Sequence, residues 1–170
     1  WDRDLIAEGI ALEGLAFARP PVGLYTIQAM IAATHASARD AADTDWPRIV
    51  GYYDLLLRAD PSPIVALNRA VARAMCDGPA AGLADIEELE RDSGAASAAG
   101  TGAAAAAPAH ILSAYCYLPA AKADLLRRLG RDTEAVQAYR AALALTEGAV
   151  ERRFLEGRIA ELAEPAEPDS

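Results

Sequence analysis

The chain has 170 residues, of which 53% are hydrophobic but only 6% aromatic, so its apolar content comes mainly from Ala and Leu. These residues are strong helix formers, and β-branched residues form no alternating runs, so we expect an all-α domain or short helical array. The formal net charge of −9 argues against direct nucleic acid binding, because an acidic surface repels phosphates. An acidic surface could bind a basic protein partner, but the same acidity is also common in proteins where it only maintains solubility.

Cysteine usage and hydropathy indicate the compartment. Cys76 and Cys116 are far apart and neither belongs to a CxxC pair, which predicts no disulfide framework and no zinc site. No apolar run approaches the roughly 20 residues of a membrane span, and no signal peptide is visible. We therefore expect a cytoplasmic protein without membrane association. Because the chain opens with Trp1 instead of Met, we also expect it to be a piece of something longer.

The N-terminal part predicts two helices. Residues 3–17 form the first, and the run Arg19-Pro20-Pro21-Val22-Gly23 breaks it. Residues 23–37 form the second, followed by a small polar connection over 36–44. The expected apolar side of the first helix carries Leu5, Ile6, Ile10, Leu12 and Leu15.

Three further helices follow from their start and stop signals. Asp45 is a predicted N-cap, with Pro47 in the first turn, and this helix ends at Asp60-Pro61. Ser62 and Pro63 predict the cap and first turn of a helix over 63–76. Cys76-Asp77-Gly78-Pro79 closes it, and residues 79–91 form its partner.

The C-terminal part predicts a helix from His110 to Arg128, with a possible kink at Pro119, and a capping helix over 150–162. The run after Leu129-Gly130-Arg131 is typical of the second helix of a tetratricopeptide-like hairpin. In this run Ala135, Tyr139 and Ala142 share one helix face, which we expect to pack against the hairpin partner. On the capping helix, the expected inward residues are Phe154, Leu155, Ile159 and Leu162.

The same spacing recurs twice upstream, at Ile49/Tyr53 and Gly82/Ile86. The first step is 33 residues, close to the tetratricopeptide period of about 34, and the second is 53. Residues 94–109 hold only Gly, Ala, Ser, Thr and Pro, and we interpret them as a flexible insertion that lengthens the second step. The predicted organisation is 1–93 (N-terminal helix and two hairpins), 94–109 (insertion), 110–162 (last hairpin and capping helix) and 163–170 (disordered tail).

Patterns of catalysis are missing from the sequence. No HExxH, GxSxG or phosphate-cradling GxxxxGK[ST] motif occurs, and the two histidines, His35 and His110, have no paired acid or nucleophile nearby. The acidic run over 85–92 is best explained as a solvated helix face. We expect no catalytic residue, no metal site and no cofactor.

One polar cluster stands out, because Asn68 and Arg69 interrupt an Ala-lined helix. Such residues are costly unless they have partners or face a groove. One interpretation is a partner-binding groove of Tyr25, Gln28, Asn68, Arg69 and Arg73 that clamps a peptide. The other is an internal network, in which Arg69 bonds Asp45 or Asp54 of the preceding helix.

Seven segments occur in an order that has a familiar look: WDRDLIAEGIAL (1–12), LYTIQAMIAATHA (24–36), ADTDWPRIVGYYDLLL (42–57), PSPIVALNRAVARA (61–74), GPAAGLADIEEL (78–89), ADLLRRLGR (123–131) and ERRFLEGRIAEL (151–162). Together they resemble the tetratricopeptide-like C-terminal extension of a group of bacterial extracytoplasmic-function (ECF) RNA polymerase sigma factors. This group is associated with YCII-related proteins. The resemblance covers essentially the whole chain, which departs from the pattern in the 94–109 insertion and in Pro119.

The resemblance implies that two sigma domains precede this chain, and that this tail regulates them. Its protein partners would be those sigma domains and RNA polymerase core, with no direct contact to nucleic acid or membrane. The residues that match the family motifs are Asp2, Arg3, Asp43, Thr44, Asp45, Trp46, Asn68, Arg69, Glu151, Arg152, Arg153 and Phe154. They are expected to form an intramolecular or polymerase-facing surface.

Three functions remain open from the sequence. The preferred one is a non-enzymatic regulatory domain that modulates transcription initiation. The second is a free-standing helical-repeat scaffold that binds a peptide or another protein. The third is a small-molecule sensor whose ligand lies beneath Asn68 and Arg69, and an enzyme is the least expected class.

Overall fold

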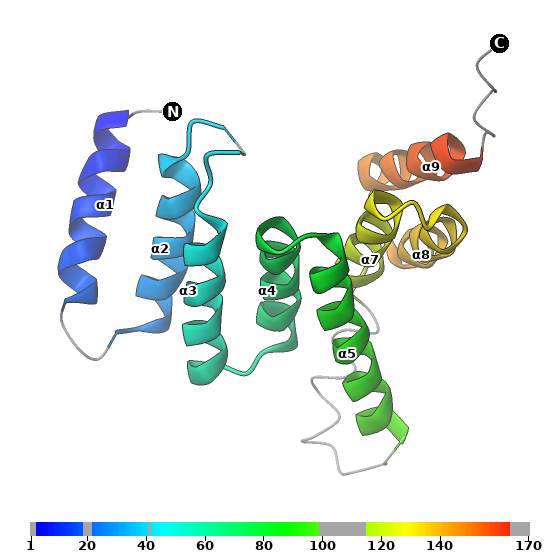
Figure 1. Ribbon diagram of the computed structural model, residues 1–170, viewed down its shortest axis with the longest axis horizontal. Coiled ribbons are helices and arrows are strands. Elements are labelled where there is room, and N and C mark those ends of the chain that lie inside the picture. The colour runs from blue at the N-terminus through cyan, green and yellow to red at the C-terminus, as the bar shows by residue number, and fades with distance from the viewer. Residues whose placement is uncertain (1–2, 19–21, 41, 99–114, 164–170) are drawn as a thin grey trace.

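The structure, a computed structural model, describes residues 3–18, 22–40, 42–98 and 115–163 (Figure 1). Within these ranges the protein is all-helical and contains no strand, as the Ala- and Leu-rich composition predicts. The helices are α1 (Arg3–Phe17), α2 (Leu24–Ser37), α3 (Trp46–Ala59), α4 (Pro63–Cys76), α5 (Pro79–Ala98), α7 (Tyr117–Arg128), α8 (Asp132–Leu145) and α9 (Ala149–Ala163).

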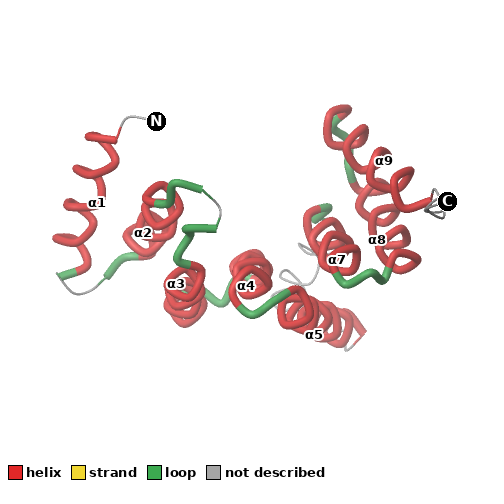
Figure 2. The backbone as a smooth tube through the Cα atoms, turned by 45° about the horizontal axis from the view of Figure 1, so that its top comes forward, coloured by secondary structure: helices red, strands yellow, loops and turns green. Residues whose placement is uncertain are grey.

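The helices form a repeat-like array in which each one packs on its neighbour in the chain. Contacts join α1 to α2, α2 to α3, α3 to α4 and α4 to α5, and then continue through α7, α8 and α9. Figure 2 shows these helices following one another along an arc, with α1 and α9 at its two ends. An array of this kind buries its core between neighbouring helices.

Two apolar clusters make up the core, and α4 belongs to both of them. The first lies among α2, α3 and α4, and Ala72 is the α4 residue buried in it. The second lies among α4, α5, α7, α8 and α9, and takes Leu67, Ala70 and Ala74 from α4. Because opposite sides of one helix enter the two clusters, α4 holds the two halves of the array together.

The tetratricopeptide-like faces lie where the spacing predicts them. Ala135, Tyr139 and Ala142 are all buried on α8, within the second cluster. On α5, Gly82 and Ile86 are buried as well. On α3 the match is looser, since Ile49 is buried but Tyr53 is half-buried and its neighbour Tyr52 takes the core position.

The turn after α7 explains why a glycine stands at position 130. Gly130 has a φ of 71°, a left-handed conformation that side chains with a Cβ adopt poorly. Its amide donates to the carbonyl of Arg127 at 3.0 Å, and the amide of Arg131 donates to the carbonyl of Leu126 at 3.0 Å. This pair of hydrogen bonds is a Schellman motif, which ends α7 and directs the chain back as α8.

α3 and α4 begin where the sequence predicts, but only one of the two predicted N-caps forms its capping hydrogen bond. Asp45 caps α3 as predicted, because its Oδ1 accepts a hydrogen bond from the amide of Arg48 at 3.1 Å. Ser62 occupies the N-cap position of α4, followed by Pro63 in the first turn, but its side chain makes no capping hydrogen bond. Here the proline, with its fixed φ, is what marks the helix start.

Two predicted boundaries were wrong. The partner helix expected over 79–91 continues to Ala98 as α5, because the Ala-rich start of the 94–109 segment favours helix over coil. The helix expected from His110 to Arg128 begins, within the described residues, only at Tyr117 as α7. Pro119, expected as a possible kink, therefore lies in the first turn of α7, where no amide donor is needed. Residues 99–114, including His110, and residues 164–170 lie outside the described part.

Several side chains expected to point inward are exposed at the ends of the array. Ile10, Leu12 and Leu15 of α1 are exposed, because among the described helices α1 packs only on α2. Phe154 of α9 is 59% exposed, whereas its neighbour Leu155 is buried. An end helix has a partner on one side only, so its apolar stripe is wider than the surface that covers it.

Candidate functional site

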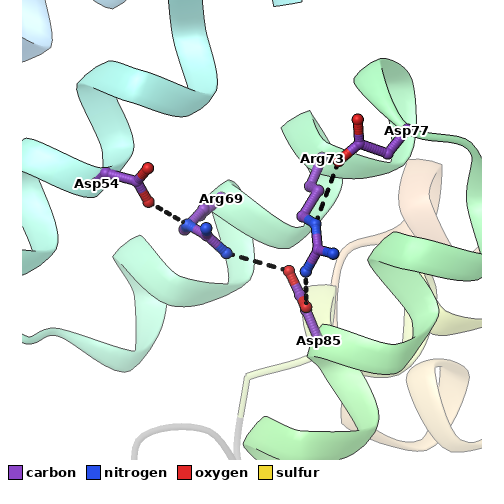
Figure 3. A network of polar contacts seen from close by, with 5 residues as sticks. All are labelled: Asp54, Arg69, Arg73, Asp77 and Asp85. Atoms are coloured by element: carbon purple, nitrogen blue, oxygen red, sulfur yellow. Dashed lines mark hydrogen bonds and ion pairs between the residues drawn. The ribbon is translucent and has the colours of Figure 1, made fainter. Parts of the chain in front are cut away.

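Arg69 and Arg73 of α4 lie in one network of ion pairs with acidic side chains, shown in Figure 3. Arg69 Nε donates to Asp54 Oδ1 of α3 at 2.6 Å, and its Nη1 donates to Asp85 Oδ2 of α5 at 3.2 Å. Arg73 Nη1 donates to the other oxygen of Asp85 at 2.5 Å. Arg73 Nε completes the chain with a 3.3 Å bond to Asp77, the residue that follows α4.

This network ties three successive helices together, because Arg69 of α4 bonds Asp54 of α3 and Asp85 of α5. Asp85 is its least exposed member, with 18% of its side chain exposed, against 27% for Arg69. The internal network that the sequence left open for Arg69, with Asp54 as partner, is therefore what the structure shows. The second partner, Asp85, was not foreseen, because the sequence showed only an acidic run on α5 whose inward member could not be identified.

The other three members of the predicted groove take no part in this network. Asn68 is exposed on α4, and the exposed Val71 and Met75 follow it at spacings of three and seven residues on the same side. Tyr25 and Gln28 are exposed on α2, with 86% of Tyr25 open to solvent. The structure thus joins Arg69 to Arg73 but leaves Asn68, Tyr25 and Gln28 free for a partner.

The motif Asp43-Thr44-Asp45-Trp46 builds the joint between α2 and α3. Besides the Asp45 cap, the amide of Trp46 donates to the carbonyl of Thr44 at 2.8 Å. The Trp46 ring meets the ring of His35 edge to face, with centroids 5.2 Å apart. Asp43 is exposed. Of the other N-terminal motif positions, Asp2 lies outside the described residues, and Arg3 is the first residue of α1.

The motif Glu151-Arg152-Arg153-Phe154 lies at the joint between α8 and α9. Arg152 Nη1 donates to the carbonyls of Leu143 at 3.0 Å and Thr146 at 2.9 Å, which are among the last acceptors of α8. Arg152 thus satisfies carbonyl groups at the C-terminal end of α8. Arg153 and Glu151 are exposed, and Phe154 carries the guanidinium of Arg158 over its ring at 5.2 Å.

A cleft of about 440 Å³ opens between α1, α2, the 38–45 connection and the start of α3. Met30 and Tyr52 form part of its apolar lining, and Arg39, Asp43 and Arg48 bring charged groups to it. Its residues come from four segments of the chain, so no local sequence pattern could have revealed it.

Arg48 is held in place at this cleft by the buried Tyr52. Its Nε donates to Tyr52 Oη at 2.7 Å, and its guanidinium carbon lies 5.7 Å from the Tyr52 ring centroid. This hydrogen bond raises the pKa of the Arg48 guanidinium above its ordinary value, with Asp45 adding a smaller effect of the same sign. Arg48 therefore presents its remaining N–H groups as a permanent cation.

The described residues include no group of three or more His, Cys, Asp or Glu side chains placed to hold a metal ion. In the same part of the chain, no helix is both long enough and apolar enough to cross a membrane. Cys76 and Cys116 are free thiols.

Comparison with known proteins gives one informative match. The chain is 39% identical over 168 residues to an uncharacterized protein of Rhizobium meliloti (strain 1021). The match covers 98% of this chain but 35% of that protein, so the chain spans about a third of the length of its relative. No family model matches the chain, and no solved structure matches it.

Proposed function

We propose that this chain is a non-catalytic protein-interaction domain of an ECF sigma factor, which modulates transcription initiation by contacting the sigma domains or RNA polymerase core. The observation that carries the proposal is the open side of α4, where Asn68, Val71 and Met75 are exposed beside a network that uses both neighbouring arginines internally. Exposed apolar side chains that cluster around a polar anchor are typical of surfaces that bind proteins.

Two further observations support an interaction domain. The array leaves apolar side chains open at several places, including Tyr25 on α2 and Phe154 on α9, and repeat arrays use such extended faces for binding. The sequence match to a protein about three times longer agrees with a domain that works beside others. The assignment to a sigma factor in this proposal is based on the sequence motifs and on their order.

The experiment measures the binding of this chain to purified RNA polymerase core and to the upstream sigma domains of its full-length protein. Asn68→Ala and Val71→Asp, which alter the open side of α4, are expected to weaken binding at least tenfold. Arg140→Ala, an exposed change on α8, is the matched control and is expected to bind as the unmodified chain does. Circular dichroism confirms that each variant is folded.

A promoter assay then tests regulation directly. The full-length protein and a version without this chain are compared for output from a promoter that the sigma domains serve. A difference between the two supports the proposal. Equal output under every growth condition, together with no binding to sigma domains or polymerase, would refute it and leave a scaffold for some other partner.

A further inference from the structure

We propose that the cleft between α1, α2 and the start of α3 binds a small zwitterion with an apolar body, which is the chemistry of an apolar α-amino acid. The site is separate from the network of Arg69 and Asp85 and from the open side of α4. The proposal stands independently of any role in transcription, because it is argued from the residues of this chain that line the cleft.

The two arginines that line the cleft fit a carboxylate. Arg39 and Arg48 both line it, and within the described part of the chain neither forms an ion pair with an acidic side chain. Arg48 uses its Nε on Tyr52, which fixes the guanidinium and leaves the two terminal nitrogens to donate. Two parallel N–H donors on one guanidinium match the two oxygens of a carboxylate.

The acidic and hydroxyl groups of the cleft fit an ammonium. Asp43 lines it, and in the described residues its carboxylate makes no hydrogen bond or ion pair. The hydroxyls of Thr34 and Ser37 also line it and donate to carbonyls of their own helix, at 2.8 Å and 2.7 Å, so their oxygens stay available as acceptors. An ammonium needs three acceptors of this kind.

The remaining lining takes the apolar body of the ligand. Met30 and Tyr52 are buried in the first core cluster, and Ala33 and Ile10 extend the apolar surface toward α1. The volume of about 440 Å³ falls within the range of roughly 300–1,000 Å³ that is usual for small-molecule sites. A single amino acid fits there with room for water.

The balance of charges is what selects a zwitterion. The lining holds two arginines and two aspartates, Asp45 being the second. Among the described residues no ion pair within 4 Å joins either arginine to either aspartate, and the charge of Asp45 acts on Arg48 from a longer distance. A plain organic anion can pair with the arginines alone, and a plain cation can pair with the carboxylates alone. A ligand with both charges can contact both kinds of group, and therefore fits this lining best.

Three probes with the same apolar body test this inference on the intact chain. L-phenylalanine carries both charges, 3-phenylpropionate lacks the ammonium, and phenethylammonium lacks the carboxylate. Titration is followed by amide chemical shifts, which also locate the binding. We expect L-phenylalanine to shift amides of α2 and the 38–45 connection, and to bind at least tenfold more tightly than either analogue.

Variants then connect binding to the named groups. Arg39→Met and Asp43→Asn each remove one charge without breaking a side-chain contact, and each is expected to weaken L-phenylalanine binding at least fivefold. Ala33→Leu, which fills the cleft without changing its charge, is expected to abolish binding. Arg58→Met is the control, because it removes a charge from the exposed last turn of α3, outside the cleft.

Several results would overturn the inference. It fails if L-phenylalanine causes no shifts at millimolar concentration, or if an analogue with one charge binds as tightly. It also fails if the shifts map to α9 or to the open side of α4. Equal weakening by Arg58→Met and Arg39→Met would show a general charge effect instead of a site.

Discussion

Replacement of Gly82 by alanine should destabilise the array at the packing of α5 on α4. A Cβ built at Gly82 would lie 2.5 Å from the Cβ of Ala74 and 2.6 Å from the carbonyl oxygen of Ala70. Neither neighbour is the end of a flexible side chain, so the two helices must move apart. Overpacking of this kind costs about 1–3 kcal/mol, while the higher helix propensity of alanine returns up to about 1 kcal/mol. We therefore expect a net loss of about 1–2 kcal/mol.

Gly51 supplies the matched control for this change. It lies in α3, is exposed, and a Cβ there would meet no heavy atom within 4 Å. Gly51→Ala is expected to stabilise the protein by up to about 1 kcal/mol, since it gains the same propensity without a clash. Urea denaturation followed by circular dichroism at 222 nm measures both variants. The close-packing argument is refuted if Gly82→Ala is as stable as Gly51→Ala.

Two further variants test the polar contacts between helices. Asp85→Asn removes the carboxylate shared by Arg69 and Arg73, and the partial exposure of these groups limits the expected loss to about 1–2 kcal/mol by urea denaturation. Asp92→Asn, an exposed change on the same helix, should shift stability by less than about 0.5 kcal/mol, and an equal effect of the two would contradict the network. Arg152→Met removes the donor to the last carbonyls of α8 and should raise amide hydrogen exchange in α9 about tenfold, whereas Arg153→Met should leave it unchanged.

Local signals in the sequence predicted the helices whose ends are marked by backbone chemistry. Pro63 starts α4 and Asp77-Gly78 ends it, so both of its boundaries were predicted correctly. Gly130 likewise marks the turn between α7 and α8. After position 91 the only local stop signal up to Ala98 is Gly94, and the alanines that follow it favour helix, so α5 was predicted too short.

Features that depend on which segments meet in space could not be predicted from local sequence patterns. The pairing of Arg69 with Asp54 was foreseen as one of two alternatives, because both lie in neighbouring helices of a hairpin. The second contact, in which Asp85 accepts from both arginines, was not foreseen. It depends on which face of α5 is turned toward α4, and the acidic run on α5 does not reveal that face. The cleft beside Arg48 requires four segments to converge, and the exposure of Phe154 depends on α9 having no helix beyond it among the described residues.

The placement of α4 explains why its open side is suited to binding. One side of this helix is buried against α3 through Ala72, another against α5 and α7 through Ala70 and Ala74, and its arginines are held by Asp54 and Asp85. The position and rotation of the helix are therefore fixed before any partner arrives. A partner that contacts Asn68, Val71 and Met75 pays little entropy to order the backbone that carries them, so a small contact area can give specific binding. By contrast, α1 packs mainly on α2 among the described helices, so fewer neighbours fix its position.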